Sequence, residues 1–172
     1  MKSIFSLILI SCLVGLHACK PKNTDTNTLK NELSSLVDKW HLAAAEADEE
    51  VYFGLLSDES IYIGTDPKEK WDKKAFYGFA EKYFKRGKAW DFKTIDREVY
   101  LTDDANYAWF DERLDTWMGI CRSSGILKKH ADGWKIEHYH LSVTIANELI
   151  QDFMEVQKKD SLNYPINEKI KL

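Results

Sequence analysis

Apolar side chains recur every three or four residues in four parts of the chain, the spacing that places them on one side of a helix. Thr28, Asp48 and Asp72 stand where N-caps are expected, because their side chains can accept hydrogen bonds from the first turn. Gly87 then ends the third helix. The pattern therefore predicts four helices, over residues 28–47, 49–56, 73–85 and 147–159.

The segments between these helices are short, β-branched or alternating, which predicts strands. One strand is expected over residues 59–64, before the turn at Thr65-Asp66-Pro67. A long strand is expected over residues 90–102, and three more between Asn106 and Ser142. The last two are joined at Asp132-Gly133, a dipeptide that favours the positive φ of a tight hairpin.

The order of these elements is helix, helix, strand, helix and then a meander of four strands, which indicates an α+β fold. Antiparallel strands with helices on one face favour a curved sheet that wraps the N-terminal helices like a cone. Such a sheet can leave a cavity between its concave face and the helices. Aromatic residues make up 13% of the chain and would wall this cavity.

The strands between Asn106 and Ser142 carry more polar side chains than a packing sheet needs, because burying such groups is costly unless they pair. Alternation on the first of them places Glu112 on the more apolar, inward face, with Asp111 left open as the alternative. On the next strand Arg122 and Ser124 share a face, and Arg122 is the expected partner of the inward carboxylate.

The last strand places two histidines on one face. Trp134 and Ile136 are expected to face inward, and the same parity carries His138 and His140 toward the cavity unless a bulge intervenes. Two histidines at this spacing have the parity of metal ligands, but no third ligand is spaced to join them. We therefore expect no metal and no organic cofactor.

These groups together suit acid–base chemistry. The candidate catalytic residues are Glu112 or Asp111 as the carboxylate, His140 as a second titratable group, and Arg122 to steady negative charge. The alternative is a satisfied polar network that only fixes strand register, with Asp66 capping a turn. The candidate ligand-binding residues are Asp66, Trp71, Trp109, Ser124 and His138.

Charge and cysteine content narrow the class of protein further. The net charge is −4 and the lysines are scattered, which argues against nucleic-acid binding because that needs clustered cations. Cys121 is the one cysteine beyond the leader, so no disulfide framework is expected. We interpret Cys121 as a small buried residue.

The N-terminus has the features of an export signal, with Lys2 before an apolar run over residues 3–16. Leu16-His17-Ala18-Cys19 resembles a bacterial lipobox, although His17 departs from the usual residue. Leu9-Ile10-Ser11-Cys12 also fits, but cleavage there would leave too short an apolar region, and an ordinary signal peptide cut nearby is the alternative. We expect a signal peptide over 1–18, a lipid at Cys19, a tether over 19–28, and a bacterial cell-envelope location on the periplasmic or outer-surface side.

Five segments form a distinctive set when taken together and in order. They are residues 63–66, Trp71, residues 108–112, residues 121–125, and Trp134-Lys135-Ile136 running to Tyr139-His140-Leu141-Ser142. This set resembles the SnoaL-like, ketosteroid isomerase-homologue group of the nuclear transport factor 2-like superfamily. The resemblance spans about residues 30–147 and implies a cone-shaped domain over 29–147, followed by a C-terminal helix and tail over 148–172. It implies less about function, because the fold hosts isomerases, cyclases, dehydratases, epoxide hydrolases and non-catalytic binders.

Two functions are therefore expected. The first is an exported, lipid-anchored domain with a pocket for a small apolar substrate and chemistry of the isomerase, dehydratase, cyclase or hydrolase type. The alternative is a non-catalytic domain that binds a ligand or a protein. A homodimer is expected in both, because Tyr139, Leu141 and Val143 would form an exposed apolar strip on the outer sheet face.

Overall fold

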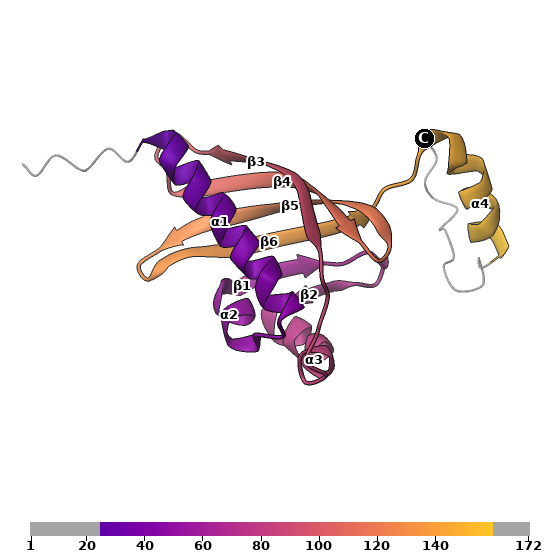
Figure 1. Cartoon of the computed structure of the whole chain (residues 1–172), viewed down its shortest axis with the longest axis horizontal. Coiled ribbons are helices and arrows are strands. Elements are labelled where there is room, and N and C mark those ends of the chain that lie inside the picture. The colour runs from indigo at the N-terminus through magenta and orange to yellow at the C-terminus, as the bar shows by residue number, and fades with distance from the viewer. Residues whose placement is uncertain (1–24, 160–172) are drawn as a thin grey trace, which may run out of the picture.

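The computed structural model describes residues 25–159, which form three helices on a curved sheet and a separate C-terminal helix (Figure 1). The helices are α1 (Thr26–Ala45), α2 (Glu49–Gly54), α3 (Lys73–Phe84), the short 3₁₀ helix η1 (Asn147–Leu149) and α4 (Ile150–Lys159). The strands are β1 (Leu56–Ile63), β2 (Lys70–Asp72), β3 (Lys93–Leu101), β4 (Tyr107–Thr116), β5 (Gly119–His130) and β6 (Gly133–Val143). The predicted signal peptide, Cys19 and the end of the tail lie outside the described residues.

The six strands form one sheet in the order β2-β1-β6-β5-β4-β3. The meander from β3 to β6 is antiparallel throughout, as the sequence predicted. The prediction of a purely antiparallel sheet was wrong, because β1 pairs with β6 in parallel. A parallel neighbour needs a long connection, and the whole chain from β2 to β5 provides it. The α+β cone itself is confirmed.

Side-chain caps set the starts of the helices. Asp48 accepts a hydrogen bond from the Val51 amide at 3.0 Å at the start of α2, and Asp72 accepts one from the Ala75 amide at 2.8 Å at the start of α3. Both predicted caps are confirmed. The cap predicted at Thr28 was wrong, because Asp25 caps α1 and the helix begins earlier.

Aromatic side chains fill the space between the helices and the concave face of the sheet. Trp40 of α1 stacks on Tyr52 of α2 with ring centroids 4.8 Å apart, and Tyr62 of β1 stacks on Phe76 of α3 at 3.9 Å. Trp40, Tyr52 and Phe76 are each at most 1% exposed. The interior predicted as a cavity is therefore occupied by a packed aromatic core, whose burial is a main source of stability.

A bulge in β6 reverses which side chains face the core. Residues 126 and 127 of β5 pair with 138 and 136 of β6, so Glu137 is the extra residue. Beyond it, Tyr139 and Leu141 point inward and are 1% and 3% exposed. The predicted outer apolar strip was therefore wrong at both positions, and His138 and His140 face outward instead of into the cone.

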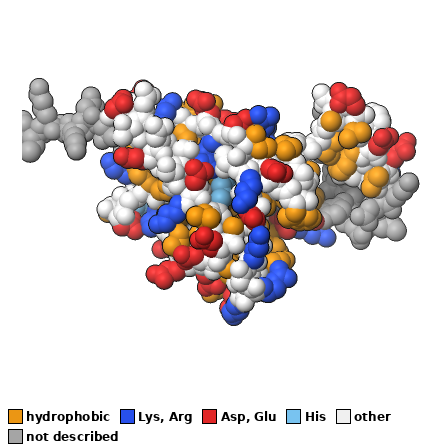
Figure 2. All heavy atoms as spheres, viewed as in Figure 1, with side chains coloured by type: hydrophobic (Ala, Val, Ile, Leu, Met, Phe, Trp, Pro, Cys, Tyr) orange, Lys and Arg blue, Asp and Glu red, His pale blue; other side chains and the backbone are white. Residues whose placement is uncertain are grey.

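Helix α4 lies beyond the end of the sheet, away from the body of the domain (Figure 1). Among the described elements it packs substantially only on η1. Figure 2 shows apolar side chains gathered on this helix, and they are well exposed to solvent. No helix within residues 25–159 is long and apolar enough to cross a membrane. The exposed apolar residues of this region are Leu149, Ile150, Phe153, Met154 and Val156.

Candidate functional site

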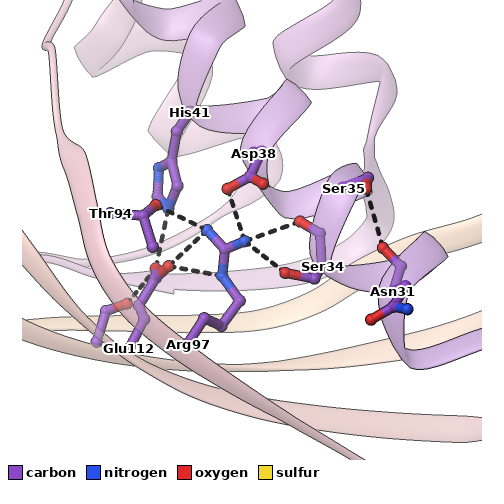
Figure 3. A network of polar contacts seen from close by, with 9 residues as sticks. Asn31, Ser34, Ser35, Asp38, His41, Thr94, Arg97 and Glu112 are labelled. Atoms are coloured by element: carbon purple, nitrogen blue, oxygen red, sulfur yellow. Dashed lines mark hydrogen bonds and ion pairs between the residues drawn. The ribbon is translucent and has the colours of Figure 1, made fainter. Parts of the chain in front are cut away.

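The Glu112 carboxylate is the centre of a buried polar network between α1 and the sheet (Figure 3). Alternation along β4 turns Glu112 inward, between the buried residues Phe110 and Leu114, and leaves it 1% exposed. Its inward placement was predicted from this alternation and is confirmed. Asp111, the alternative, lies on the other face and is half-buried.

Arg97 of β3 is the cation that pairs with Glu112. Its Nε donates to Oε2 of Glu112 at 2.8 Å, and its side chain is only 2% exposed. The remaining guanidinium donors reach α1, where Nη1 contacts the Ser34 carbonyl oxygen at 2.8 Å and Asp38 Oδ1 at 2.7 Å (Figure 3). The guanidinium therefore fastens the first helix to the sheet through a buried carboxylate.

Two further donors complete the shell around Glu112. Ser123 of β5 donates its hydroxyl to Oε1 at 2.6 Å, and His41 of α1 lies with Nε2 at 2.9 Å from the same oxygen. An ionised carboxylate only accepts hydrogen bonds, so Nε2 of His41 carries the proton. Two strands and a helix thus converge on one acid.

The Glu112 carboxyl is held in its ionised form. Burial raises its pKa, but the hydrogen bond and charge of His41, the charge of Arg97 and the hydrogen bond from Ser123 outweigh burial, so the pKa lies below its ordinary value. A carboxylate with a lowered pKa and a full set of donors is a weak proton acceptor. The geometry therefore suits a fixed structural anion better than a general base.

One polar group next to this network lacks a partner. The Tyr139 hydroxyl lies beside Ser123 but makes no hydrogen bond of good geometry with any described residue. Burial, followed by the negative charge of Glu112, raises the pKa of Tyr139 well above its ordinary value, so this phenol stays protonated. Trp40 and Tyr52 also bury a polar atom without a partner in the described part of the chain.

The other predicted catalytic residues meet on the opposite, outer face of the sheet. Asp111, Arg122, Ser124 and His140 line a shallow hollow of about 190 Å³ there. The prediction that Arg122 pairs with the inward carboxylate was wrong, because β5 turns Cys121 and Ser123 inward and Arg122 outward. Cys121 itself is buried, as predicted.

The remaining predicted ligand-binding residues do not gather at one site. Asp66 lies in the β1–β2 turn, where its side chain accepts from the Lys68 amide at 2.8 Å. Trp71 lies on β2 and stacks on Phe79 at 4.6 Å, within the aromatic packing. Trp109 lies on the outer sheet face and is 46% exposed.

His138 and His140 share the outer face of β6, but no further ligand joins them. No group of three or more His, Cys, Asp or Glu within residues 25–159 is placed to hold a metal ion.

The outer face carries a row of register partners that crosses five strands. Tyr100 of β3 pairs with Trp109 of β4, which pairs with Ile126 of β5, then His138 of β6 and Ile61 of β1. We call these five residues the outer row. Tyr100 and Trp109 stack at 5.4 Å, and Ile126 is 41% exposed. Burial lowers the pKa of His138, so this side chain is neutral at pH 7 and the row is apolar.

A second row on the same face is polar. It runs from Glu98 through Asp111 and Ser124 to His140, again as register partners on β3 to β6. The acids lie at the β3–β4 side and the histidine at the β6 side. The two rows together form a surface with separate apolar and charged bands.

Comparison with known proteins identifies the family. The SnoaL-like domain matches residues 33–146, which is most of the described chain. The chain belongs to the SnoaL-like domain family. No curated protein matches the chain significantly.

Solved structures of the nuclear transport factor 2-like fold resemble this SnoaL-like chain. A nuclear transport factor 2-like protein of unknown function from Pseudomonas putida has a TM-score of 0.59 at 13% identity, over 73% of this chain and 93% of that one. A provisionally named ketosteroid isomerase from Parabacteroides distasonis has a TM-score of 0.53 at 19% identity, over 67% and 88%. The association domain of the C. elegans calmodulin-dependent kinase II has a TM-score of 0.53 at 14% identity, over 68% and 97%. At these identities the similarity concerns the fold.

Sequence reasoning missed Arg97 and His41, although both carried a signal. His41 lies four residues after Val37, on the apolar side of the first helix. Arg97 shares its strand face with Val99 and Leu101. A polar or charged side chain on a buried face needs a buried partner. Because Glu112 was already predicted to face inward, it could have been identified as the partner of both residues.

Proposed function

We propose that this chain is a non-catalytic binding domain, exported and tethered to an envelope membrane by a lipid at Cys19, which works as a homodimer through the outer face of its sheet. The observation that carries the proposal is the outer row, an apolar band that crosses five strands in register and in which Trp109 and Ile126 are 46% and 41% exposed. Contiguous exposed apolar surface of this kind marks a site of protein association.

The size of the surface suits a stable dimer. Five strands of about ten residues, spaced about 4.8 Å apart, cover on the order of 800 Å². A standard protein interface buries about 800 Å² per partner. A second copy therefore suffices to cover the face.

The two rows are also complementary to themselves. A two-fold axis that runs along β5 places β4 of one copy opposite β6 of the other. Asp111 then faces the partner subunit's His140, Trp109 faces the partner's His138, and Ile126 faces its own copy. The acid on one half of the face therefore meets a histidine on the other half, so the face is complementary to a second copy of itself.

The state of Glu112 supports a binding role over catalysis. The catalytic hypothesis required an acid, Arg122 and His140 around one enclosed pocket. Glu112 lies on the inner face with Arg97. The alternative acid, Asp111, does meet Arg122 and His140, but in a shallow hollow on the outer face and not in an enclosed pocket. Among similar structures, the names include both provisional enzymes and an association domain, so binding is within the range of the fold.

The oligomeric state tests this function. We expect the full-length protein, extracted in mild detergent, to sediment as a dimer at tens of micromolar, and Ile126→Glu to convert it to a monomer with an unchanged circular dichroism spectrum. Leu42→Glu is the matched control, because Leu42 is 54% exposed on α1, away from the sheet face. A wild-type monomer at high micromolar concentration would refute the proposal.

One observation favours a second candidate function, the acid–base conversion of a small apolar molecule that enters the aromatic core next to Glu112. The unpartnered Tyr139 hydroxyl lies beside the Glu112–His41 pair, and a buried hydroxyl without a partner costs about 1–3 kcal/mol. A ligand oxygen would satisfy it. A thermal-shift screen with small hydroxylated aromatics tests this function: hits that Tyr139→Phe abolishes support it, and hits unaffected by Tyr139→Phe would place the ligand elsewhere.

A further inference from the structure

The pairing between β1 and β6 lapses at one point and opens a gap in the sheet. Leu56 pairs with Ile136 and Ile61 pairs with His138, so four residues of β1 lie opposite Glu137 alone. The gap forms one wall of a hollow of about 400 Å³, which the end of α2, the start of α3 and the β5–β6 hairpin also line. Small-molecule sites are commonly of this size. We call it the hairpin hollow, and its lining includes Ser57, Lys73, Lys128, Lys135 and Glu137.

Ser57 lies in the gap with a hydroxyl that has no partner. The residue is only 6% exposed and lines the hairpin hollow, yet its Oγ makes no hydrogen bond with any described residue. A buried hydroxyl without a partner is unfavourable, so its presence calls for an explanation. Irregular strand pairing is frequent next to functional sites, where it re-aims a side chain. A polar ligand in the hollow would supply the partner that Ser57 lacks.

Two half-buried lysines bring further donors to the hollow. Nζ of Lys73 donates to the Leu56 carbonyl oxygen and to Asp58 Oδ1, both at 2.9 Å. Nζ of Lys135 donates to the carbonyl oxygen of the last α2 residue at 2.7 Å and lies 3.3 Å from Asp132 Oδ2. An ammonium group has three N–H donors, so each lysine keeps one that no described residue uses. The carbonyl oxygens hold both Nζ atoms in place for a ligand.

The charges around the hollow are nearly balanced. Each of these two lysines has its own acid, and Oε1 of Glu137 lies 2.6 Å from Nε2 of His130. Lys128 and Glu59 remain, one charge of each sign, and neither forms an ion pair within residues 25–159. A charged ligand would therefore meet about as many repulsive groups as attractive ones. An apolar ligand is equally unsuited, because Leu56 has the only apolar side chain among the described residues of the lining.

We propose that the hairpin hollow binds a neutral polyhydroxylated molecule, a mono- or disaccharide. A sugar hydroxyl both donates and accepts hydrogen bonds, so it can bridge an ammonium group and the neighbouring carboxylate without separating the two charges. Hydrogen bonds to charged groups are about twice as strong as those between neutral groups. The hydroxyl of Ser57 adds a contact within the gap. The inference goes beyond the proposed dimer and does not rest on it, because the lining includes no residue of the outer row.

Calorimetric titration with a panel of sugars tests the site. The full-length protein, in a detergent without a sugar head group, is titrated with glucose, galactose and maltose, and with the charged counterparts glucuronate, galacturonate and glucose 6-phosphate. We expect at least one neutral sugar to bind, and its charged counterpart to bind more weakly. Ser57→Ala should raise the dissociation constant about fivefold through the loss of one hydrogen bond. Ser60→Ala is the matched control, because Ser60 is 3% exposed on the same strand but lies outside the lining.

A second pair of variants tests the opposite wall of the hollow. Lys128→Met removes an ammonium group of the lining and should weaken sugar binding. Lys129→Met should leave it unchanged, because Lys129 is exposed next in the chain but lies outside the lining. Circular dichroism of all four variants should match the wild type.

Three outcomes would overturn the inference. The first is that no sugar of the panel binds, and the second is that only the charged sugars bind. The third is an affinity that neither Ser57→Ala nor Lys128→Met changes, which would place the ligand elsewhere. None of these outcomes depends on sedimentation, so the saccharide site and the dimer stand or fall separately.

Discussion

The guanidinium of Arg97 and the carboxylate of Glu112 lie in contact between the first helix and the sheet, with Nε 2.8 Å from Oε2. The pair joins neighbouring strands, because Arg97 and Glu112 are register partners on β3 and β4. Through Ser34 and Asp38 the same guanidinium holds α1. The network therefore fixes the angle at which the helix crosses the concave face.

Replacing Glu112 tests the structural role of this pair. We expect Glu112→Gln to lower the free energy of unfolding by about 3–5 kcal/mol, because it leaves the buried Arg97 without its counter-charge. Urea denaturation followed by circular dichroism measures the change. Asp115→Asn, exposed on the same strand, is the matched control and should cost about 0.5 kcal/mol or less. Equal losses in both variants would contradict the assignment.

The same carboxyl predicts how stability depends on pH. The pKa of Glu112 is lower in the folded protein than its ordinary value of 4.5, so its ionised form favours folding. This contribution is fully present above pH 4.5 and is lost as the pH falls through the folded pKa. The stability difference between wild type and Glu112→Gln should therefore shrink below pH 4.5. A difference that stays constant down to the acid transition would show that ionisation is not its cause.

Close packing at Gly125 predicts a second stability effect. A Cβ at this position would lie 2.5 Å from two atoms of the Phe110 ring and 2.9 Å from the His138 carbonyl oxygen. We expect Gly125→Ala to destabilise the protein by about 1–3 kcal/mol through overpacking. Gly78→Ala is the control with the opposite sign, because Gly78 lies exposed within α3 with no atom within 4 Å of the new Cβ. It should stabilise by about 0.5–1 kcal/mol, as measured by denaturation.

The lipid anchor can be tested at the N-terminus. We expect the mature protein to begin at Cys19 and to carry acyl chains there, which intact-mass spectrometry of the membrane fraction would detect. Cys19→Ala should move the protein out of the membrane fraction. The control is Cys12→Ala, which should leave both the mass of the mature chain and its location unchanged. An unacylated start at another residue would refute the anchor.

Local patterns in the sequence were sufficient to locate the helices and to predict which face of β4 points inward. The spacing of Trp40 and its neighbours located α1, and alternation on β4 placed Glu112 inward. These predictions succeeded because the period of an element is a local property. The same patterns gave the order of the elements from helix to meander, and the family resemblance then supported the cone.

Features that depend on pairing between distant segments could not be predicted. One extra residue at Glu137 reversed the parity of β6 and moved His138 and His140 to the outer face, because a bulge is defined by the partner strand. The parallel pairing of β1 with β6 is likewise set by tertiary packing. Arg97 and His41 were overlooked for a different reason. Each is a polar residue among apolar ones, and its burial makes sense only once both side chains are seen to contact the Glu112 carboxylate.

The position of β6 in the middle of the sheet has a consequence for the order of folding. This strand is the last of the chain to be made, yet it lies between β1 and β5 and joins the two halves of the sheet. Tyr62 of β1 cannot meet Tyr139 of β6 until a loop of more than seventy residues has closed, and closing such distant contacts slows folding. An emerging chain therefore keeps its two halves apart until β6 has been made, so the edges of β1 and β5 that pair with β6 stay unpaired until then.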